Sequence, residues 1–571
     1  MGSCKWDIAN DSIRDSKTPY NSLKMRFLSW LISPEETNHF LARWIFLRAL
    51  GLIYFSAFYS LLFQIKGLIG PRGILPAADY LPAVAQHFPG WHRFWFAPTL
   101  FWGSSSDGML MLVCWVGLAA SVAVILNLWP RAGLLVSFIC FLSFVAAAQD
   151  FAGYQSDGML LEAGFISLFF APGGLRPRLG TGHPPSRLSL FLLRWEWFRI
   201  YFESGIVKLS SGDYSWRHLT AMDDYYQNGP LPTWVGWYVQ HLPHWFHAAS
   251  AFMALAAELG LVFMLFLPRR FKIICFFILT PFQIGIILTA NYTFLNYLVL
   301  ALGFLLLDDD FLRRILPKRW TEARLPTAAT DPGTGEPLPA PTGVAASLKP
   351  AWLKPARRAI TAVSLGWVFY ATTALLLATL ATLSRNLDGA GWERSALWKP
   401  VAALEPFRIA NGYGLFAVMT HQRYEIEFQG TPDGENWVAY PFRYKPQALA
   451  AAPGIYAPYQ PRFEWNLWFA SLGSWRRNDW VLNAEARLLR NEPNVLALFA
   501  SNPFPKEPPR QVRAVLWQYW FTDRATKRRE GTWWRRQLVK EYAPALEVRS
   551  DGKIHVAEYD RRFLEADAAE R

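Results

Sequence analysis

Three apolar segments of this 571-residue chain carry ionisable side chains of the kind that perform acid–base chemistry. The most charged segment, "RWEWFRIYFESGIVK" (194–208), is aromatic enough for a membrane helix yet holds five charges, and "YQSDGMLLEAGF" and "MALAAELGLVF" add three carboxylates. Buried carboxylates with a lysine can form a proton path or a reactive site, and an intramembrane charge is a functional hypothesis by default. The candidate residues are Asp157, Glu162, Arg194, Glu196, Arg199, Glu203, Lys208 and Glu258.

The spacing within 194–208 suggests a second, purely structural role. Glu196, Arg199 and Glu203 follow one another at i, i+3 and i+7, which places them within about 60° on a helix, so a Glu–Arg–Glu ladder can form. Arg194 and Lys208 lie nearer the ends, where long side chains can reach the interface. An isolated central charge costs roughly 2.5–3.5 kcal/mol on insertion scales. We therefore expect this face to point into a helical bundle.

The candidate set is not balanced in charge. It contains five carboxylates but only three basic groups, so some carboxylates must be protonated, hydrated or near an interface. An ion-pair network that fixes helix packing and a proton path or reactive site therefore both remain open.

The elements that position these residues are predicted membrane helices. The composition is 52% hydrophobic and 16% aromatic, and its 18% of charged residues lies below the roughly 25% typical of soluble domains. Apolar segments long enough, or nearly so, for a ~30 Å hydrocarbon core predict nine crossings. They cover 41–65, 109–129, 132–149, 156–172, 189–209, 248–267, 272–290, 293–307 and 360–383.

The basic residues predict the orientation of these helices. The net charge is +13, but Lys and Arg stand in short clusters beside apolar segments, which is typical of the positive-inside pattern rather than of a nucleic-acid groove. We expect no nucleic-acid partner. The clusters fall on one side if the N-terminus is cytoplasmic, and everything after residue 385 then lies outside. They include Arg131, Arg176, Arg178, Arg187, Arg269, Arg270, Lys272, Arg313 and Arg314.

The fold class that follows is a polytopic α-helical membrane bundle followed by a β-rich, α+β and sandwich-like, soluble domain. "RYEIEFQG" and "VAYPFRYKP" alternate in the period-2 pattern of strands around the turn "TPDGENW". "QVRAVLWQYWFT" and "TWWRRQLV" predict two more strands, and 464–500 is expected to be helical. The predicted segments are a cytoplasmic N-terminal segment (1–40), a membrane domain (41–310), a cytoplasmic Pro/Ala-rich linker (311–359), a last transmembrane helix (360–385), an extracytoplasmic β-rich domain (386–550) and a C-terminal tail (551–571).

The sequence indicates neither a metal site nor a cofactor. The four cysteines have no paired spacing, so neither a disulfide framework nor a zinc site is indicated. "HLPHWFH" places His241, His244 and His247 three apart, but Pro243 interrupts the helix that would align them. We interpret them as interfacial histidines.

Aromatic residues of the soluble part predict a surface for a client protein. "FEWNLWFASLGSWRRNDW" contains Trp465, Trp468, Phe469, Trp475 and Trp480. Roughly half of them are expected in the core, and the rest to contact the membrane surface or a client, because aromatic residues and arginine are favoured at interfaces.

The chain resembles the lipase maturation factor family. "GLIGPRGILPA", "SDGMLLEAGF", "WFRIYFESGIVKLSSGDYSWRHLTAMDDYYQNGPLPTWVGWYVQHLPHWFH" and "NYTFLNYL" are similar to its membrane half. "RIANGYGLFAVMT", "YEIEFQGTPDGENWVAYPFRYKP", "NDWV" and "NPFPKEPPRQVRAVLWQYWFT" are similar to its C-terminal domain. The resemblance, over about residues 40–548, implies a polytopic membrane protein that helps secreted lipases fold and assemble, with animal members in the endoplasmic reticulum (ER) membrane. It implies no catalytic residues.

Two hypotheses for function follow. The first is a membrane-embedded maturation factor, not an enzyme, for secreted lipases or other exported proteins, with the lipid bilayer and such a client as partners. The alternative is a membrane enzyme or proton-coupled transporter that uses the intramembrane carboxylates and Lys208. The external part has no cysteine and no Asn-x-Ser/Thr site, which favours a bacterial inner membrane, with the ER membrane expected if the chain is eukaryotic.

Overall fold

The computed structural model describes residues 39–317, 353–383 and 394–557. Most of the predicted N-terminal segment, of the predicted linker and of the predicted tail lies outside the described residues.

Each predicted membrane segment coincides with a helix. Six helices in the described ranges are long and apolar enough to cross a membrane: α2, α6, α7, α13 with η3, α14 and α18. The helix α8 has only 16 residues, α15 with η4 spans only Leu295–Leu306, and α9 carries the charges. The bounds are α2 (Phe40–Leu62), α6 (Asp107–Ile125), α7 (Pro130–Ala147), α8 (Gln155–Phe170), α9 (Arg187–Ser210), α13 (His244–Leu259), η3 (Leu261–Phe266), α14 (Arg269–Thr289), α15 (Leu295–Gly303), η4 (Phe304–Leu306) and α18 (Leu353–Ala381).

Small residues allow these helices to pack closely. A Cβ atom on Gly117 of α6 would lie 2.4 Å from the Phe58 ring of α2, and one on Gly205 of α9 would lie 2.7 Å from Leu259 of α13. Such close approach is the usual packing mode where the surrounding lipid supplies no hydrophobic driving force between helices. α9 therefore lies inside the bundle, against α8, α13, α15 and α18.

Short helices connect the membrane helices at both ends. Several begin at a side chain that accepts a backbone N–H, such as Asp213 before α10, Thr233 before α12 and Asp308 before α16. Their bounds are α3 (Ile65–Ile69), α4 (Ala77–His87), α5 (His92–Phe96), η1 (Leu100–Trp102), η2 (Gln149–Ala152), α10 (Tyr214–Arg217), α11 (Ala221–Asn228), α12 (Trp234–Gln240) and α16 (Asp309–Ile315).

The C-terminal part contains a five-stranded antiparallel sheet in the order β2-β1-β3-β4-β5. The strands are β1 (Arg423–Thr431), β2 (Val438–Ala439), β3 (Gln511–Phe521), β4 (Trp534–Val548) and β5 (Ile554–Val556). The helices are α20 (Lys399–Ala402), η5 (Glu405–Phe407), α21 (Arg462–Ser471), η6 (Trp475–Arg477), α22 (Trp480–Leu489), α23 (Pro493–Leu496) and α24 (Arg524–Glu530). The predicted β-rich α+β domain is confirmed, and its predicted hairpin is β1–β2.

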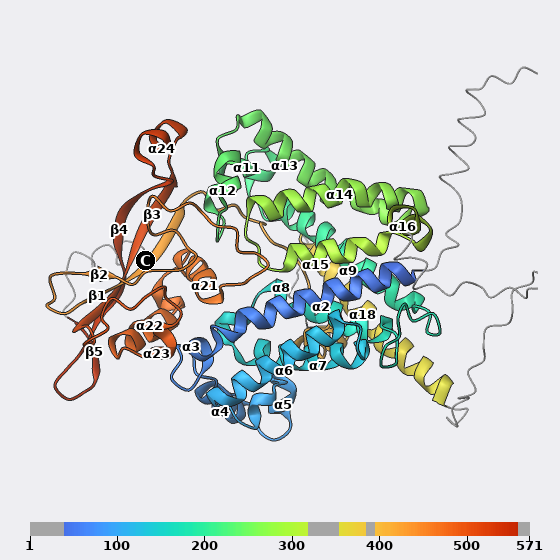
Figure 1. The fold of residues 1–571 in the computed structure, drawn as a ribbon, viewed down its shortest axis with the longest axis horizontal. Coiled ribbons are helices and arrows are strands. Elements are labelled where there is room, and N and C mark those ends of the chain that lie inside the picture. Colours follow the sequence, from blue (N-terminus) through green and yellow to red (C-terminus); the bar gives the residue numbers. More distant parts are fainter. Residues whose placement is uncertain (1–38, 318–352, 384–393, 558–571) are drawn as a thin grey trace, which may run out of the picture.

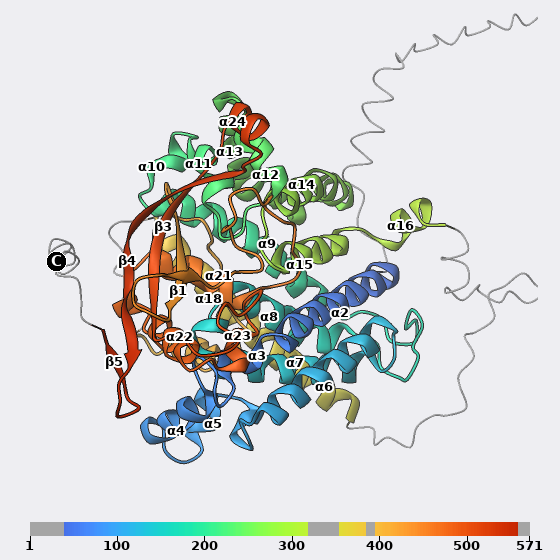
Figure 2. The same cartoon turned by 60° about the vertical axis from the view of Figure 1, so that its left-hand side comes forward.

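One face of the sheet is covered by helices where a sandwich would place a second sheet. Phe428 of β1 packs on Phe463 of α21 with ring centroids 6.3 Å apart, and the Tyr542 hydroxyl of β4 donates to Ala470 O of α21. Figures 1 and 2 show α21, α22 and α23 between the sheet and the membrane helices. The domain therefore meets the bundle through its helical layer.

The C-terminal domain lies at the end of the bundle opposite α16 (Figure 1). At the α16 end, Asp309 accepts the N–H groups of Phe40 and Leu41 at the start of α2, and Arg269 at the start of α14 pairs with Asp308. The starts of α2 and α14 and the basic residues near them therefore share one end.

Candidate functional site

Arg199 in α9 holds together two helices of the bundle, α8 and α9, and the C-terminal part of the chain. Its guanidinium pairs with Glu162 of α8 and lies 3.9 Å from Glu203, one turn further along α9. It also donates to the backbone carbonyl of Asn411, 212 positions later in the sequence. Arg199, Glu162 and Glu203 are all fully buried. The charged face of α9 therefore points into protein, as the spacing predicted.

Asn411 extends this network into α8. Its backbone N–H donates to Glu162 Oε2 at 3.0 Å, and its side-chain amide donates to the carbonyls of Gly158 at 3.0 Å and Arg408 at 2.9 Å. A Cβ atom on Gly158 would lie 2.5 Å from Asn411 Oδ1. A glycine at position 158 is therefore what lets the segment around Asn411 reach the helix.

The residues after Asn411 are also held by bundle side chains. The Tyr413 N–H donates to Glu203 Oε2 at 2.6 Å, and the Gly414 N–H donates to Gln155 Oε1 of α8 at 2.9 Å. We call residues 411–414 the docking segment. It forms its hydrogen bonds with α8 and α9 instead of with the sheet, because buried backbone groups need partners.

A second buried ion pair joins α8 to α21. Arg462 donates to both carboxylate oxygens of Asp157 at 2.8 Å, and to the Phe151 carbonyl at 2.8 Å. Both side chains are almost completely buried. Two parallel hydrogen bonds give this pair a fixed geometry as well as charge neutralisation.

Lys208 and Glu258 form a separate pair between α9 and α13. The Lys208 ammonium also donates to Ser204 Oγ at 2.9 Å and lies 4.8 Å from the Trp216 ring. Lys208 therefore neutralises the charge of Glu258. Among the described residues, this pair shares no hydrogen bond with Arg199, Glu162 or Glu203.

The two remaining candidates of α9 differ from the predicted ladder. Arg194 donates to the Leu305 carbonyl at 2.8 Å and contacts His39 at 2.8 Å, near the start of α2. Glu196 is fully buried, and neither of its carboxylate oxygens has a hydrogen-bond partner among the described residues. Arg199 turns toward Glu162 and Asn411, so the ladder contains Arg199 and Glu203 but leaves out Glu196.

The aromatic residues predicted for a client surface divide into two groups. Trp465, Trp468 and Trp480 are buried. Trp465 packs on Tyr154 with ring centroids 6.5 Å apart, and the Trp480 ring lies 5.3 Å from Phe151. These three side chains therefore belong to the core or to the contact between the domain and the bundle.

The other two aromatic residues reach the surface. Phe469 is 41% exposed, and Trp475 is half-buried. Phe469 and Trp475 are therefore the members of the predicted set that are available to a partner.

The polar residues of these clusters act as structural links. Glu162 and Glu203 bind Arg199 and backbone N–H groups, whereas Glu258 binds Lys208 in a separate cluster. Among the described residues, no group of three or more His, Cys, Asp or Glu side chains could hold a metal ion. His244 and His247 both approach Asp223, at 2.9 Å and 3.7 Å, whereas His241 contacts the Thr522 carbonyl at 3.0 Å.

Sequence reasoning missed several residues that join the two parts, among them Asn411, Arg462, Asn291 and Arg423. The Asn291 amide donates to Gly454 O at 3.0 Å and its Oδ1 accepts the Tyr456 N–H at 2.7 Å. Arg423 donates to the carbonyls of Gln227 and Pro230 at 3.0 Å each. Asn291 and Asn411 lie in "NYTFLNYL" and "RIANGYGLFAVMT", two motifs of the resemblance, which is the signal that could have found them.

Comparison with known proteins follows the same two parts. Residues 41–314 match the lipase maturation factor transmembrane domain, and residues 409–544 match the lipase maturation factor C-terminal domain. No solved structure gives a significant match.

Curated relatives align over most of the chain. Human lipase maturation factor 2 is 32% identical, over 89% of this chain and 83% of its own length. The chicken lipase maturation factor 2 is 31% identical over 89% and 81%, and bovine lipase maturation factor 1 is 30% identical over 89% of each chain. The chain, a multi-pass membrane protein, therefore belongs to the lipase maturation factor family.

Proposed function

We propose that this protein assists the folding and assembly of secreted lipases, or of other exported proteins, and that it is not an enzyme. The names of its relatives support lipase clients. The observation that carries the proposal is the buried network of Arg199, Glu203 and Asn411, because it ties the chain just before the β-rich domain to the membrane bundle. Such a domain can hold a client beside the membrane that the client has just crossed.

The distribution of charge supports an external position for this domain. Arg187 and Arg269 stand at the starts of α9 and α14, at the end of the bundle opposite the sheet. Basic residues prefer the cytoplasmic side. We propose a cytoplasmic N-terminus and a C-terminal domain that faces the periplasm of a bacterium, which the lack of external cysteines favours, or the ER lumen of a eukaryote.

We place the client contact at the exposed end of α21. Phe469 is 41% exposed and Leu472 is 48% exposed, and Trp475 lies three residues further along. Solvent-exposed aromatic and aliphatic side chains of this kind can cover apolar surface on a folding intermediate.

A secretion assay tests this function. The full-length chain is co-expressed with a secreted lipase in cells that lack their own maturation factor, because the contacts of residues 411–414 tie the domain to the bundle. We expect active lipase in the medium only when the chain is present. Equal lipase activity with and without the chain would refute the proposal for that client.

The client surface has a matched control. Phe469→Ser with Leu472→Ser should reduce secreted lipase activity without changing the thermal stability of the factor. Leu538→Ser with Val539→Ser removes comparable exposed side chains from β4, which are 50% and 45% exposed, and should leave secretion unchanged. Equal losses from both pairs would place the contact elsewhere.

A further inference from the structure

A cavity of about 620 Å³ lies within the membrane bundle, between α9, α11, α13, α14 and α15. Tyr413, Leu415 and Phe416 of the C-terminal part close one side. Most of the lining is aromatic or aliphatic, including Phe246, Met253, Phe282 and Ile286. The volume falls in the range of roughly 300–1,000 Å³ that is typical of small-molecule sites.

The mouth of this cavity lies on two candidate membrane spans, α13 and α14. Trp245 and Met253 of α13 line it and are 70% and 49% exposed, and Gly285 of α14 lines it and is exposed. α13 begins and α14 ends at the side of the C-terminal domain (Figure 1). The cavity therefore opens into the leaflet nearest that domain.

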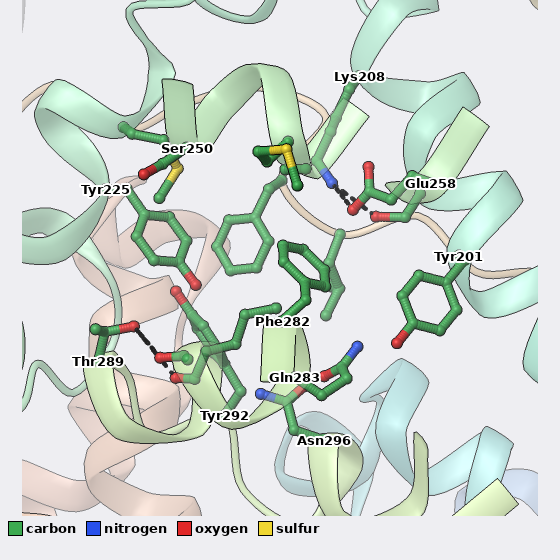
Figure 3. A pocket seen from close by; sticks show the side chains of 18 of the residues that line it. Tyr201, Lys208, Tyr225, Ser250, Glu258, Phe282, Gln283, Thr289, Tyr292 and Asn296 are labelled. Carbon is green, nitrogen blue, oxygen red and sulfur yellow. Dashed lines mark hydrogen bonds and ion pairs between the residues drawn. The ribbon is translucent and has the colours of Figure 1, made fainter. Parts of the chain in front are cut away.

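Among the described residues, two oxygen atoms in the wall, Glu258 Oε2 and Gln283 Oε1, accept no hydrogen bond. Both residues are only 6% exposed. Figure 3 shows both side chains at the edge of the cavity, with the Lys208–Glu258 pair at one end. Buried acceptors without donors are costly, so a molecule that brings donors into the cavity is favoured.

We propose that the cavity binds a neutral, hydroxyl-bearing lipid of the acylglycerol type from this leaflet. Its acyl chain lies along Met253, Phe282 and Ile286, and its hydroxyl groups donate to Glu258 Oε2 and Gln283 Oε1. A neutral headgroup fits because Lys208 already neutralises Glu258. An anionic headgroup would add a second negative charge beside that carboxylate, and an ester without hydroxyls would leave both acceptors unpaired.

Photolabelling of the full-length protein tests the site. The protein is placed in phosphatidylcholine vesicles with a monoacylglycerol that carries a diazirine on its acyl chain, and the labelled residues are mapped by mass spectrometry. We expect saturable labelling on α13 and α14 around Met253, Phe282 and Ile286, displaced by unlabelled monoacylglycerol. Uniform, non-saturable labelling of exposed helix faces would overturn the proposal.

Two glycines give a matched pair of variants. A Cβ atom on Gly285 of α14 or on Gly366 of α18 would meet nothing within 4 Å, but only Gly285 lines the cavity. Gly285→Phe should lower the saturable labelling by about tenfold or more, whereas Gly366→Phe should leave it unchanged. Equal labelling of the two variants would overturn the site.

The headgroup contact is tested separately with Gln283→Leu, which removes the Oε1 acceptor, and the folding of the variant is checked by its melting temperature. It should weaken competition by monoacylglycerol by roughly threefold to tenfold. The corresponding acyl methyl ester has no hydroxyl, so it should displace the photolabel poorly from the wild type. It should displace the photolabel from the variant to the same extent as from the wild type. Equal competition by ester and monoacylglycerol in the wild type would refute hydroxyl recognition. Because the comparison of ester and monoacylglycerol uses the wild-type protein, it tests the site even if Gly285→Phe does not fold.

Discussion

The guanidinium of Arg462 in α21 donates two hydrogen bonds of 2.8 Å to the carboxylate of Asp157 in α8, across 305 positions of the chain. Both side chains are buried between the soluble domain and the bundle. A buried pair of this geometry fixes how two parts of a structure fit together, although its net contribution to stability can be small compared with apolar residues of similar size.

Breaking this pair on one side should be severe. Arg462→Ala leaves a buried, uncompensated Asp157 carboxylate and should lower the free energy of unfolding by about 3–5 kcal/mol. Thermal unfolding in detergent, followed by size-exclusion chromatography, measures the effect. Arg529→Ala removes an exposed ion pair with Glu530 and should leave the melting temperature unchanged. Combining Asp157→Leu with Arg462→Met should recover most of the loss, and no recovery would show that the charges themselves are required.

Two glutamates of α9 should respond in opposite ways to the same substitution. Glu203→Gln places an amide beside Arg199 and weakens the bond from Tyr413 N–H, so stability should fall by about 1–3 kcal/mol. Neither carboxylate oxygen of Glu196 has a hydrogen-bond partner among the described residues, so Glu196→Gln should be neutral or stabilising, because a buried charge without hydrogen bonds is costly. Melting temperatures of both variants provide the comparison. Equal destabilisation would mean that Glu196 also has a structural partner.

Gly158→Ala should destabilise the protein, although alanine has a higher helix propensity than glycine. Alanine is normally favoured over glycine within helices by about 1 kcal/mol, but here the new Cβ would lie 2.5 Å from Asn411 Oδ1. The clash should cost about 1–3 kcal/mol and loosen the docking segment. Protease cleavage between α18 and β1, followed by gel electrophoresis, reports this loosening. Adding Asn411→Gly should remove the effect of Gly158→Ala, since the two residues are in contact. Additive losses would exclude this contact as the cause.

Glu485 in α22 should make stability depend on pH. Burial raises the pKa of its carboxyl well above the usual value, the Glu541 carboxylate raises it further, and the Ala514 N–H lowers it in part. The folded state thus favours the protonated form, so this contribution to stability is complete below about pH 4.3, the ordinary glutamate pKa, and is lost as pH rises toward the folded pKa.

The substitution Glu485→Gln removes this titration. Its melting temperature should match that of the wild type near pH 4.5 and exceed it increasingly up to pH 8. A constant difference between the two proteins over this interval would show that Glu485 does not titrate with folding.

The membrane helices and strands could be predicted because their patterns depend only on residues that are close together in the sequence. Long apolar stretches predicted helices, and alternation in "RYEIEFQG" predicted β1, because each element needs one apolar surface. The inward face of α9 followed from the cost of a charge in lipid. These inferences need no knowledge of distant residues.

The contacts between the two parts could not be predicted in this way. Arg199 meets Asn411, and Asp157 meets Arg462, across 212 and 305 positions, and no periodicity links such residues. Trp465 and Trp480 were harder still, because α21 and α22 are covered by the sheet on one side and by the bundle on the other. In the sequence, an aromatic residue at such an internal contact cannot be told from one that binds a client, because both kinds of interface are rich in aromatic residues.

The docking segment has a consequence for biosynthesis. Ribosomes make Arg199 long before Asn411, which follows it by 212 positions, so α8 and α9 enter the membrane while their final partners are still untranslated. A nascent chain that stops before residue 411 leaves Asp157 without Arg462 and Glu203 without the Tyr413 N–H. We therefore expect truncated products to be removed by membrane quality control, and the finished protein to acquire its stable form only after its last third has emerged.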